Sequence, residues 1–300
     1  MGTEVFERDA DEFSVVFGDT LHDGISTEFG IVQHLRRITI GKGEDRFAEG
    51  SLYVHLEGDV SKISISELSY NSTFVTAIAF ADLSAGLERS GCDPQSGSGE
   101  IVLVVLMDSD MPDHTMARAA ITATEGITAS VQDLGLAFNG NPASGSVSQK
   151  IIAVRSRECG LYLRGAGKHT KLGELIGRST IEAVKSSAAS NGTTIDARRS
   201  IIQMLGDYGY DQDRLFKMAD MLDYARFLDK VLAKDADSRA VATVSAVIHI
   251  HNEVQWGLLD EGTGLEAAMG LMRVGLHEPV RSSSILDSLA QTAVLFFKED

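Results

Sequence analysis

The run Ile101–Met107 (IVLVVLM) is seven consecutive apolar residues in a chain of 300. Successive side chains of a strand point to opposite faces, so a strand stays apolar throughout only where both faces are covered. The run therefore predicts a central, buried strand. Thr73–Phe80 (TFVTAIAF) has the same texture and predicts a second buried strand.

Further strands and helices are expected on both sides of this pair. Apolar and β-branched content predicts strands at Phe13–Phe17, Leu35–Ile40, Leu52–Leu56 and Ile63–Leu68. Ile151–Val154 and Leu161–Leu163 are expected to form a hairpin or two short strands. Asp113 to about Leu136 and Lys171–Ser187 carry apolar residues at the helical period and predict two helices.

The texture changes after the segment SSAASNGTT (186–194), which is a candidate linker. Beyond it, helices are expected at Leu215–Leu232, Ala240–Leu259 and Ile285–Phe297, the last with Ser284 and Asp287 placed as a capping box. The predicted fold class is α/β: a layered domain with a mixed β-sheet and packed helices at 1–190, followed by a mainly helical domain or extension at 195–300.

The net charge of −16 and the pI near 4.9 argue against nucleic acid as a partner, because a polyanion would be repelled. No apolar run reaches 18 residues, so no membrane span is expected. The N-terminus lacks the apolar stretch of a secretory signal, which makes the cytoplasm the expected location. Cys92 and Cys159 are too few for a disulfide framework, and no adjacent base marks either as a nucleophile.

The loop RGAGKHTKLGE (164–174) carries the clearest chemical pattern. It is not a nucleotide-binding P-loop, because Gly167-Lys168 is followed by His169 rather than by Ser or Thr. Thr170 is placed to cap the helix that begins at Lys171, where free backbone N–H groups attract an anion. The alternative is that the glycines only turn the chain and Thr170 only caps.

Several segments resemble the adenosylcobinamide amidohydrolase family of cobalamin salvage, in that family's order and over roughly residues 5–190. GKHTKLGELIGRSTIEAVK (167–185) is similar to its C-terminal motif and ITATEGITASVQDLG (121–135) to its "TATEAK…LQDLG" helix. Weaker similarities are ASGSVSQ (143–149) to "TGTxTD", FVTA (74–77) to "FVTAG", and ISTEFG (25–30) to "STGIDGG".

The resemblance implies hydrolysis of the amide that joins the corrin propionyl group to aminopropanol, giving adenosylcobyric acid. Such a reaction needs an activated water, a stabilised oxyanion and a proton for the leaving amine. His169 and Glu125 are the candidate catalytic residues. The candidate substrate-binding residues are Ser26, Thr27, Thr76, Ser144, Ser146, Gly167, Thr170 and Glu174. A small-molecule corrinoid is the implied partner, as substrate or ligand, and no cofactor is implied.

Three glycine-rich turns depart from the family pattern: residues 76–82 lack its glycine and asparagine, Gly30 is all that remains of its glycine pair, and Gln149 replaces its acidic residue. The alternative function is therefore a non-catalytic relative that binds a corrinoid or a partner protein. Glu125 has a second interpretation, as a solvated glutamate. Glu174 has one as an ion-pair partner of Arg178.

No metal site is expected. His249 and His251 lie about 200° apart on the predicted helix and cannot hold one ion together. Trp256 and Met218, Met221, Met269 and Met272 are expected to pack a core or the face of a homo-oligomer. The hypothesis as a whole requires the turns at 26–30, 76–82, 144–149 and 165–170 to meet around the start of the helix at Lys171.

Overall fold

The computed structural model describes residues 4–193 and 200–299. Contacts divide the chain into two compact units. The first contains the residues up to 136 together with 143–193, and the second contains 137–142 together with the residues from 194 onward. No described helix is both long and apolar enough to cross a lipid bilayer.

The first unit is built on a six-stranded mixed sheet whose order, in the described residues, is β4-β3-β15-β11-β9-β8. Its strands are β3 (His22–Ser26), β4 (Gly30–Leu35), β8 (Ser64–Tyr70), β9 (Thr73–Asp82), β11 (Glu100–Met107) and β15 (Ser148–Ser156). The predicted central run forms β11, which pairs in parallel with β15 and antiparallel with β9. All eight residues of β11 are buried, as expected for a strand that is covered on both faces.

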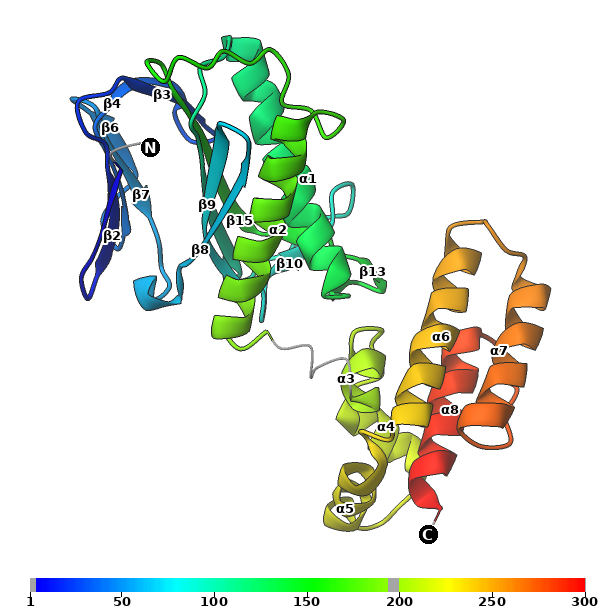
Figure 1. Cartoon of the computed structure of the whole chain (residues 1–300). Helices are drawn as coiled ribbons and strands as arrows, with labels where there is room; N and C mark the ends of the chain where they lie inside the picture. Colours follow the sequence, from blue (N-terminus) through cyan, green and yellow to red (C-terminus); the bar gives the residue numbers. More distant parts are fainter. Residues whose placement is uncertain (1–3, 194–199, 300) are drawn as a thin grey trace. The chain divides into compact units, whose positions relative to one another are not determined.

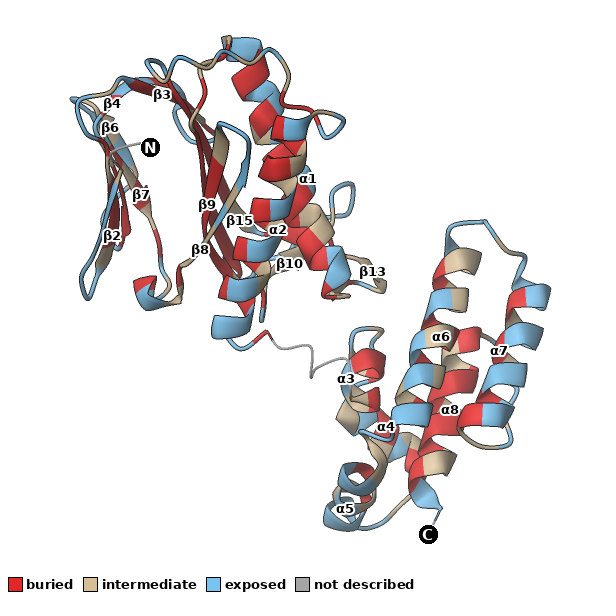
Figure 2. Cartoon of the chain, viewed as in Figure 1, coloured by how far each residue is buried: buried red, intermediate tan, exposed pale blue. Residues whose placement is uncertain are grey.

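A second sheet, of five described strands in the order β1-β2-β5-β7-β6, packs on one face of the first. Its strands are β1 (Val5–Arg8), β2 (Glu12–Val16), β5 (Arg37–Gly41), β6 (Arg46–Ala48) and β7 (Ser51–His55). The hydrophobic core between the sheets includes Phe13, Ile38 and Leu52 from this sheet and Ile78, Phe80 and Val104 from the first. Figure 2 shows the buried residues along the facing strands.

Two helices, α1 (Asp113–Asp133) and α2 (Lys171–Ser190), cover the opposite face of the six-stranded sheet (Figure 1). The unit is thus a sheet–sheet–helix sandwich. Side chains alternate along β9, so Ile78 and Phe80 point toward the second sheet, whereas Ala77, Ala79 and Ala81 point toward the helices. Small residues on that face let α2 approach the sheet closely.

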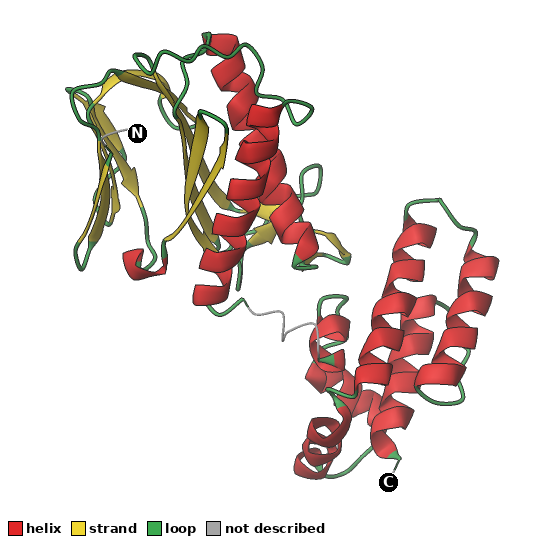
Figure 3. Ribbon diagram, in the orientation of Figure 1, coloured by secondary structure: helices red, strands yellow, loops and turns green. Residues whose placement is uncertain are grey.

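Short strands and one turn of 3-10 helix complete the first unit: β10 (Leu87–Glu88) with β14 (Gly145–Ser146), and η1 (Val60–Lys62). The second unit contains the paired strands β12 (Ala137–Phe138) and β13 (Asn141–Pro142) and is otherwise helical (Figure 3), with α3 (Ile201–Gly206), α4 (Gln212–Ala219), α5 (Tyr224–Lys234), α6 (Ser238–Gln255), α7 (Glu261–Gly275) and α8 (Ile285–Lys298). Its own core gathers Leu215, Phe227, Val247, Met272 and Phe297. The predicted fold class, a mixed sheet with packed helices followed by a helical region, is confirmed.

Three local predictions were wrong. Residues 151–154 do form a strand, but residues 161–163 form neither a second strand nor a hairpin with them: β15 pairs on its two edges with β11 and β3, and Tyr162 forms only an isolated bridge with Asp110. Leu215–Leu232 is two helices rather than one, because Asp220 adopts φ +48° and Asp223 caps α5. The candidate linker does not begin at 186, since α2 continues to Ser190; the last linker residue, 194, lies outside the described residues.

The serines of that segment have a structural use that composition did not reveal. The buried Ser187 Oγ accepts a hydrogen bond from the Ala81 N–H at 2.8 Å and donates one to the Lys62 carbonyl at 2.8 Å. The Asn191 amide donates to the Ala81 carbonyl at 3.1 Å. The end of α2 is therefore fixed to the sheet by hydrogen bonds rather than released into a linker.

Candidate functional site

The loop before α2 is a closed turn capped by Thr170. The Thr170 hydroxyl accepts a hydrogen bond from the Gly173 N–H at 3.1 Å and donates to the Gly167 carbonyl at 2.8 Å. This bond satisfies one of the N–H groups that a helix leaves without an intrahelical partner, and a second, the Thr170 N–H, donates to the Gly167 carbonyl at 2.8 Å. The prediction that Thr170 caps this helix is confirmed.

Two threonines of α1 hold the same loop from the side. Thr115 Oγ1 donates to the Arg164 carbonyl at 3.1 Å, and the buried Thr122 Oγ1 donates to the Ala166 carbonyl at 2.7 Å. The loop also packs on α2 itself, because a Cβ at Gly173 would lie 2.0 Å from the Gly167 carbonyl oxygen. Gly173 thus permits a contact between loop and helix that a larger residue would prevent.

The candidate catalytic residues lie next to this loop. Glu125 Oε1 accepts a hydrogen bond from Lys168 Nζ at 2.9 Å, within an ion pair, and the Glu125 side chain is 44% exposed. His169 is exposed, and its ring lies against Gly167, where an added Cβ would meet the ring carbon Cε1 at 2.9 Å. The structure therefore brings Glu125, Lys168 and His169 to one patch of surface. Lys168 was not a predicted site residue, because its pairing with α1 is a tertiary contact that spacing does not reveal.

Glu174 lies one turn into α2 and contacts two cations. It forms a hydrogen bond with Lys171, and its Oε1 is 3.7 Å from Arg178 Nη1. The hydrogen bond from Lys171 lowers the pKa of the Glu174 carboxyl. Its partners match the ion-pair interpretation of this residue. A substrate-binding role for Glu174 stays a prediction.

Ser144 and Ser146 use their hydroxyls within the fold. Ser144 Oγ accepts from the Ser90 N–H at 2.9 Å, and Ser146 Oγ donates to the Gly86 carbonyl at 3.4 Å. The Ser144 carbonyl accepts from Thr128 of α1 at 2.9 Å, which places this segment one helical turn beyond Glu125. These hydroxyls connect β14 to the segment around β10.

Ser26 is the last residue of β3, and Thr27 begins the turn into β4. Ser26 is buried and pairs with Ile152, so it faces the second sheet rather than the helices. Thr27 Oγ1 accepts from the Ile151 N–H at 3.1 Å. Thr76 also faces the second sheet, because it shares a face of β9 with Ile78 and lies opposite Leu106 of the core.

The four turns therefore do not meet around the start of α2, and the expectation that they do was wrong. Period-2 alternation places Ser26 and Thr76 on one face of the six-stranded sheet, whereas the 165–170 loop lies with the helices on the other. Glu125, Gly167, His169, Thr170 and Glu174 are the predicted residues that come together.

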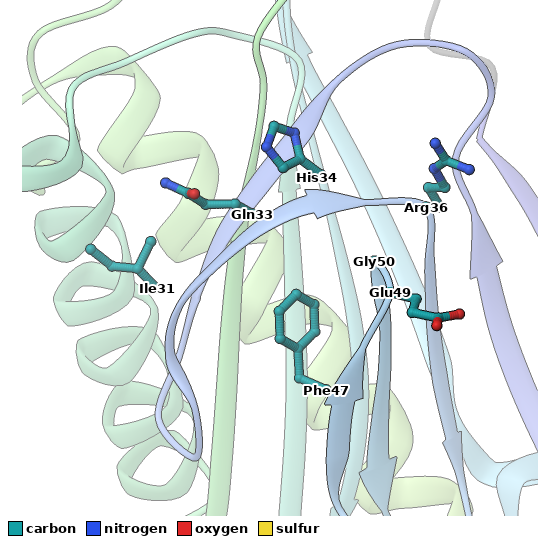
Figure 4. Close-up of a pocket in the computed structure, with 7 residues that line it drawn as sticks. All are labelled: Ile31, Gln33, His34, Arg36, Phe47, Glu49 and Gly50. Atoms are coloured by element: carbon teal, nitrogen blue, oxygen red, sulfur yellow. The ribbon is translucent and has the colours of Figure 1, made fainter.

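A cavity lies elsewhere, at the open edge between the two sheets (Figure 4). It has a volume of about 700 Å³, and its lining residues are Ile31, Gln33, His34, Arg36, Phe47, Glu49 and Gly50. None of them was a predicted site residue. The cavity depends on the left-handed backbone of His34 and on the approach of β4 to β6, and no sequence pattern reveals either feature.

Within residues 4–193 and 200–299, no three His, Cys, Asp or Glu side chains gather as a metal-binding group. His249 and His251 lie on α6, as expected. His249 pairs with Glu253 at 3.4 Å, whereas His251 packs edge-on against Tyr208. Met272 belongs to the helical core, and Trp256 remains 42% exposed.

Comparison with known proteins places the loop and its helices in a family. Over a 98-residue stretch the chain is 33% identical to an uncharacterized protein of Methanocaldococcus jannaschii; the match spans 30% of this chain and 38% of that relative. The sequence model of adenosylcobinamide amidohydrolase matches residues 57–195, a narrower region than the expected 5–190. This region runs from the end of β7 through α2 and holds Glu125 and His169, while Ser26 and Thr27 lie outside it. Residues 57–195 thus belong to the adenosylcobinamide amidohydrolase family.

Proposed function

We propose that this protein hydrolyses the aminopropanol amide of adenosylcobinamide, giving adenosylcobyric acid, at the loop that precedes α2. The observation that carries the proposal is the meeting of Glu125, Lys168 and His169 at the start of α2, within the segment that matches the family. Family membership supplies the reaction class, and the geometry supplies the residues.

The loop offers the groups that amide hydrolysis needs. The reaction requires a base that takes a proton from water, donors for the oxyanion of the tetrahedral intermediate, and an acid that protonates the leaving amine. An imidazole ring can both accept and donate a proton, and this is the role proposed for His169. The N–H groups at the start of α2 are placed for the oxyanion, because the positive end of a helix stabilises negative charge.

Lys168 and Glu125 then have positioning roles in this proposal. The ion pair between them joins α1 to the loop that carries His169. The His169 ring lies against Gly167 in the same loop. Exposure of the patch suits a large substrate that presents one side chain to the loop and keeps its macrocycle outside. The glycines at 165 and 167 let the backbone approach such a ligand closely.

A second candidate function is binding of a corrinoid, or of a partner protein, without hydrolysis. One observation favours it: the hydroxyls of Ser144 and Ser146 and the side chain of Glu174 already have partners within the chain. A site with fewer free donors holds a reacting amide less firmly. The altered glycine turns have the same implication.

Incubation of the purified protein with adenosylcobinamide separates the two functions. The proposed enzyme releases 1-amino-2-propanol, which is detected by mass spectrometry, together with adenosylcobyric acid. Binding measured by calorimetry without release supports the second function. If the protein neither binds adenosylcobinamide nor releases 1-amino-2-propanol, both proposed functions are ruled out.

A further inference from the structure

The cavity at the edge between the sheets belongs neither to the 57–195 segment nor to the loop before α2. Its walls come from β4, from the turn between β4 and β5, and from β6 with the turn into β7. In Figure 4 the Phe47 ring projects below β4, between the Gln33 and Ile31 side and the Arg36 and Glu49 side. Phe47 is half-buried and packs on the core between the sheets, so the cavity has an apolar floor.

Two residues that line the cavity have an uncommon backbone. His34 adopts φ +56° and Glu49 adopts φ +51°, values that non-glycine residues rarely take. Glu49 and Gly50, at φ +78°, form the tight turn between β6 and β7. The pairing of β4 with β3 is irregular between His22 and Gly24, and the bulge on β4 redirects His34. Strained backbone of this kind persists only where its surroundings hold it, and it is concentrated at functional sites.

The buried Asp23 carboxylate supplies that support. The Asp23 carboxylate accepts from the His34 N–H at 3.0 Å and from Arg157 Nη1 at 2.8 Å. Arg155, which is buried, lies 3.3 Å from the same carboxylate and 3.0 Å from Asp113 at the start of α1. The wall that carries His34 is therefore fixed to the centre of the unit, as in a preformed site.

The polar side chains of this cavity have no partners in the described part of the chain. Gln33, His34, Arg36 and Glu49 form no side-chain hydrogen bond or ion pair there. Neighbouring Arg37, by contrast, pairs with Glu7 at 3.1 Å. The Arg36 N–H donates to the Gly50 carbonyl at 2.8 Å, so the backbone of Arg36 lies directly against the turn that carries Glu49.

We propose that this cavity binds a small zwitterion with an apolar side chain, that is, an amino acid or a short peptide. Arg36 would bind its carboxylate through the planar, bidentate guanidinium, and Glu49 would bind its ammonium group. Phe47 and Ile31 would cover the apolar side chain, since pockets for small ligands combine an apolar surface with a few polar groups that orient the ligand. An unpaired cation and an unpaired anion in one cavity are complementary to a ligand that carries both charges.

Calorimetry with the whole protein tests the proposal. The two probes are L-phenylalanine, whose ammonium and carboxylate groups lie on one carbon atom, and the dipeptide Leu-Phe, whose charged groups lie farther apart. We expect saturable binding of one of them, and its identity decides between amino acid and peptide. Arg36→Gln and Glu49→Gln should each weaken that binding about tenfold, because each removes a charge-assisted hydrogen bond. Arg37→Gln, next in sequence but outside the cavity, is the matched control and should bind as the wild type does.

Two analogues of the phenylalanine arm assign the charges. 3-Phenylpropionate lacks the ammonium group and should be insensitive to Glu49→Gln, while phenethylamine lacks the carboxylate and should be insensitive to Arg36→Gln. No saturable binding of either zwitterion to the folded wild type would overturn the proposal, as would equal binding by the wild type and both cavity variants. Because no corrinoid is used, failure here leaves the proposed hydrolysis unaffected.

Discussion

Single residues decide how this fold holds its charged groups, and Asp23 is the clearest case. Burial by itself would raise the pKa of its carboxyl, but hydrogen bonds from the His34 N–H, Arg157 and Arg155 outweigh burial and lower the pKa below the ordinary 3.8. A depressed carboxyl pKa stabilises the fold above the pKa of the unfolded chain, and this stability is lost as the pH falls through the folded value.

Asp23→Asn should therefore lower the free energy of unfolding by about 3 kcal/mol at pH 7, because it leaves the buried Arg155 short of one anionic partner. The difference from the wild type should shrink as the pH falls below 3.8, where the unfolded chain takes up the proton, and should vanish below the lower pKa of the folded carboxyl, where the wild-type Asp23 also becomes neutral. Urea unfolding at a series of pH values measures both. Arg178→Gln, which breaks only an exposed pair, is the control and should change stability by less than ~1 kcal/mol. A pH-independent difference for Asp23→Asn would show that its charge is not what stabilises the bulge.

Gly167 tests the link between backbone and chemistry at the proposed site. A methyl group at this position would meet the His169 ring at 2.9 Å, and the ring, being exposed, can move away. We expect Gly167→Ala to lower the rate of aminopropanol release while the melting temperature stays nearly unchanged. Stability and activity that fall in parallel would instead make Gly167 a residue of the fold.

At the scale of the secondary-structure element, the sequence predicted where hydrophobic periodicity is strong and failed where tertiary contacts decide. The runs at Thr73–Phe80 and Ile101–Met107 became β9 and β11, and both helices of the first unit begin at the expected residue. Leu215–Leu232 looked continuous because its apolar period passes through Asp220, whose left-handed backbone is a local event.

The candidate site was predictable only in part, for a reason that also belongs to this scale. His169 and Thr170 lie in one turn of chain, and Glu125 reaches them because α1 and α2 pack together. The family resemblance places Ser26 and Thr76 in the same pocket, because the motifs that contain them occur in the family's order. A side chain's face depends on the register of its strand, which the motif does not contain.

Two glycines of α2 make a matched pair for a prediction about this helix. Gly173→Ala places a methyl group 2.0 Å from the Gly167 carbonyl oxygen, whereas Gly177→Ala meets nothing within 4 Å. We expect Gly173→Ala to displace the loop and abolish aminopropanol release. Gly177→Ala should keep the activity and raise stability by about 0.5–1 kcal/mol, because alanine favours a helix interior. Full activity in Gly173→Ala would mean that the loop's position on α2 does not matter for the reaction.

At the scale of the whole molecule, two separate hydrophobic cores should unfold as two separate cooperative units. Phe227 is fully buried in the helical core, so Phe227→Ala should cost about 3–5 kcal/mol there. Scanning calorimetry should show one transition moving to lower temperature and the other staying in place. A single transition that moves as a whole would mean that the two units unfold together.

The sequence indicated that the mixed strand and helix patterns give way to helical patterns near residue 190, but it did not indicate what the helical region does. Its amphipathic periods predict helices, and helices by themselves carry no chemistry. The boundary between a 1–190 domain and a 195–300 domain, and a homo-oligomeric state, stay predictions. The family segment covers only residues 57–195, so neither the five-stranded second sheet nor the helical unit gains a function from it.

The central claim is that the loop before α2 hydrolyses a corrinoid amide with His169 as the group that exchanges protons. The most direct measurement follows 1-amino-2-propanol released from adenosylcobinamide by the wild type, by His169→Ala and by His249→Ala, an exposed histidine of α6 that serves as the control. We predict release by the wild type and by His249→Ala, and a loss of about a hundredfold or more in His169→Ala at an unchanged melting temperature. Equal release by all three proteins, or none from the folded wild type, would contradict the claim.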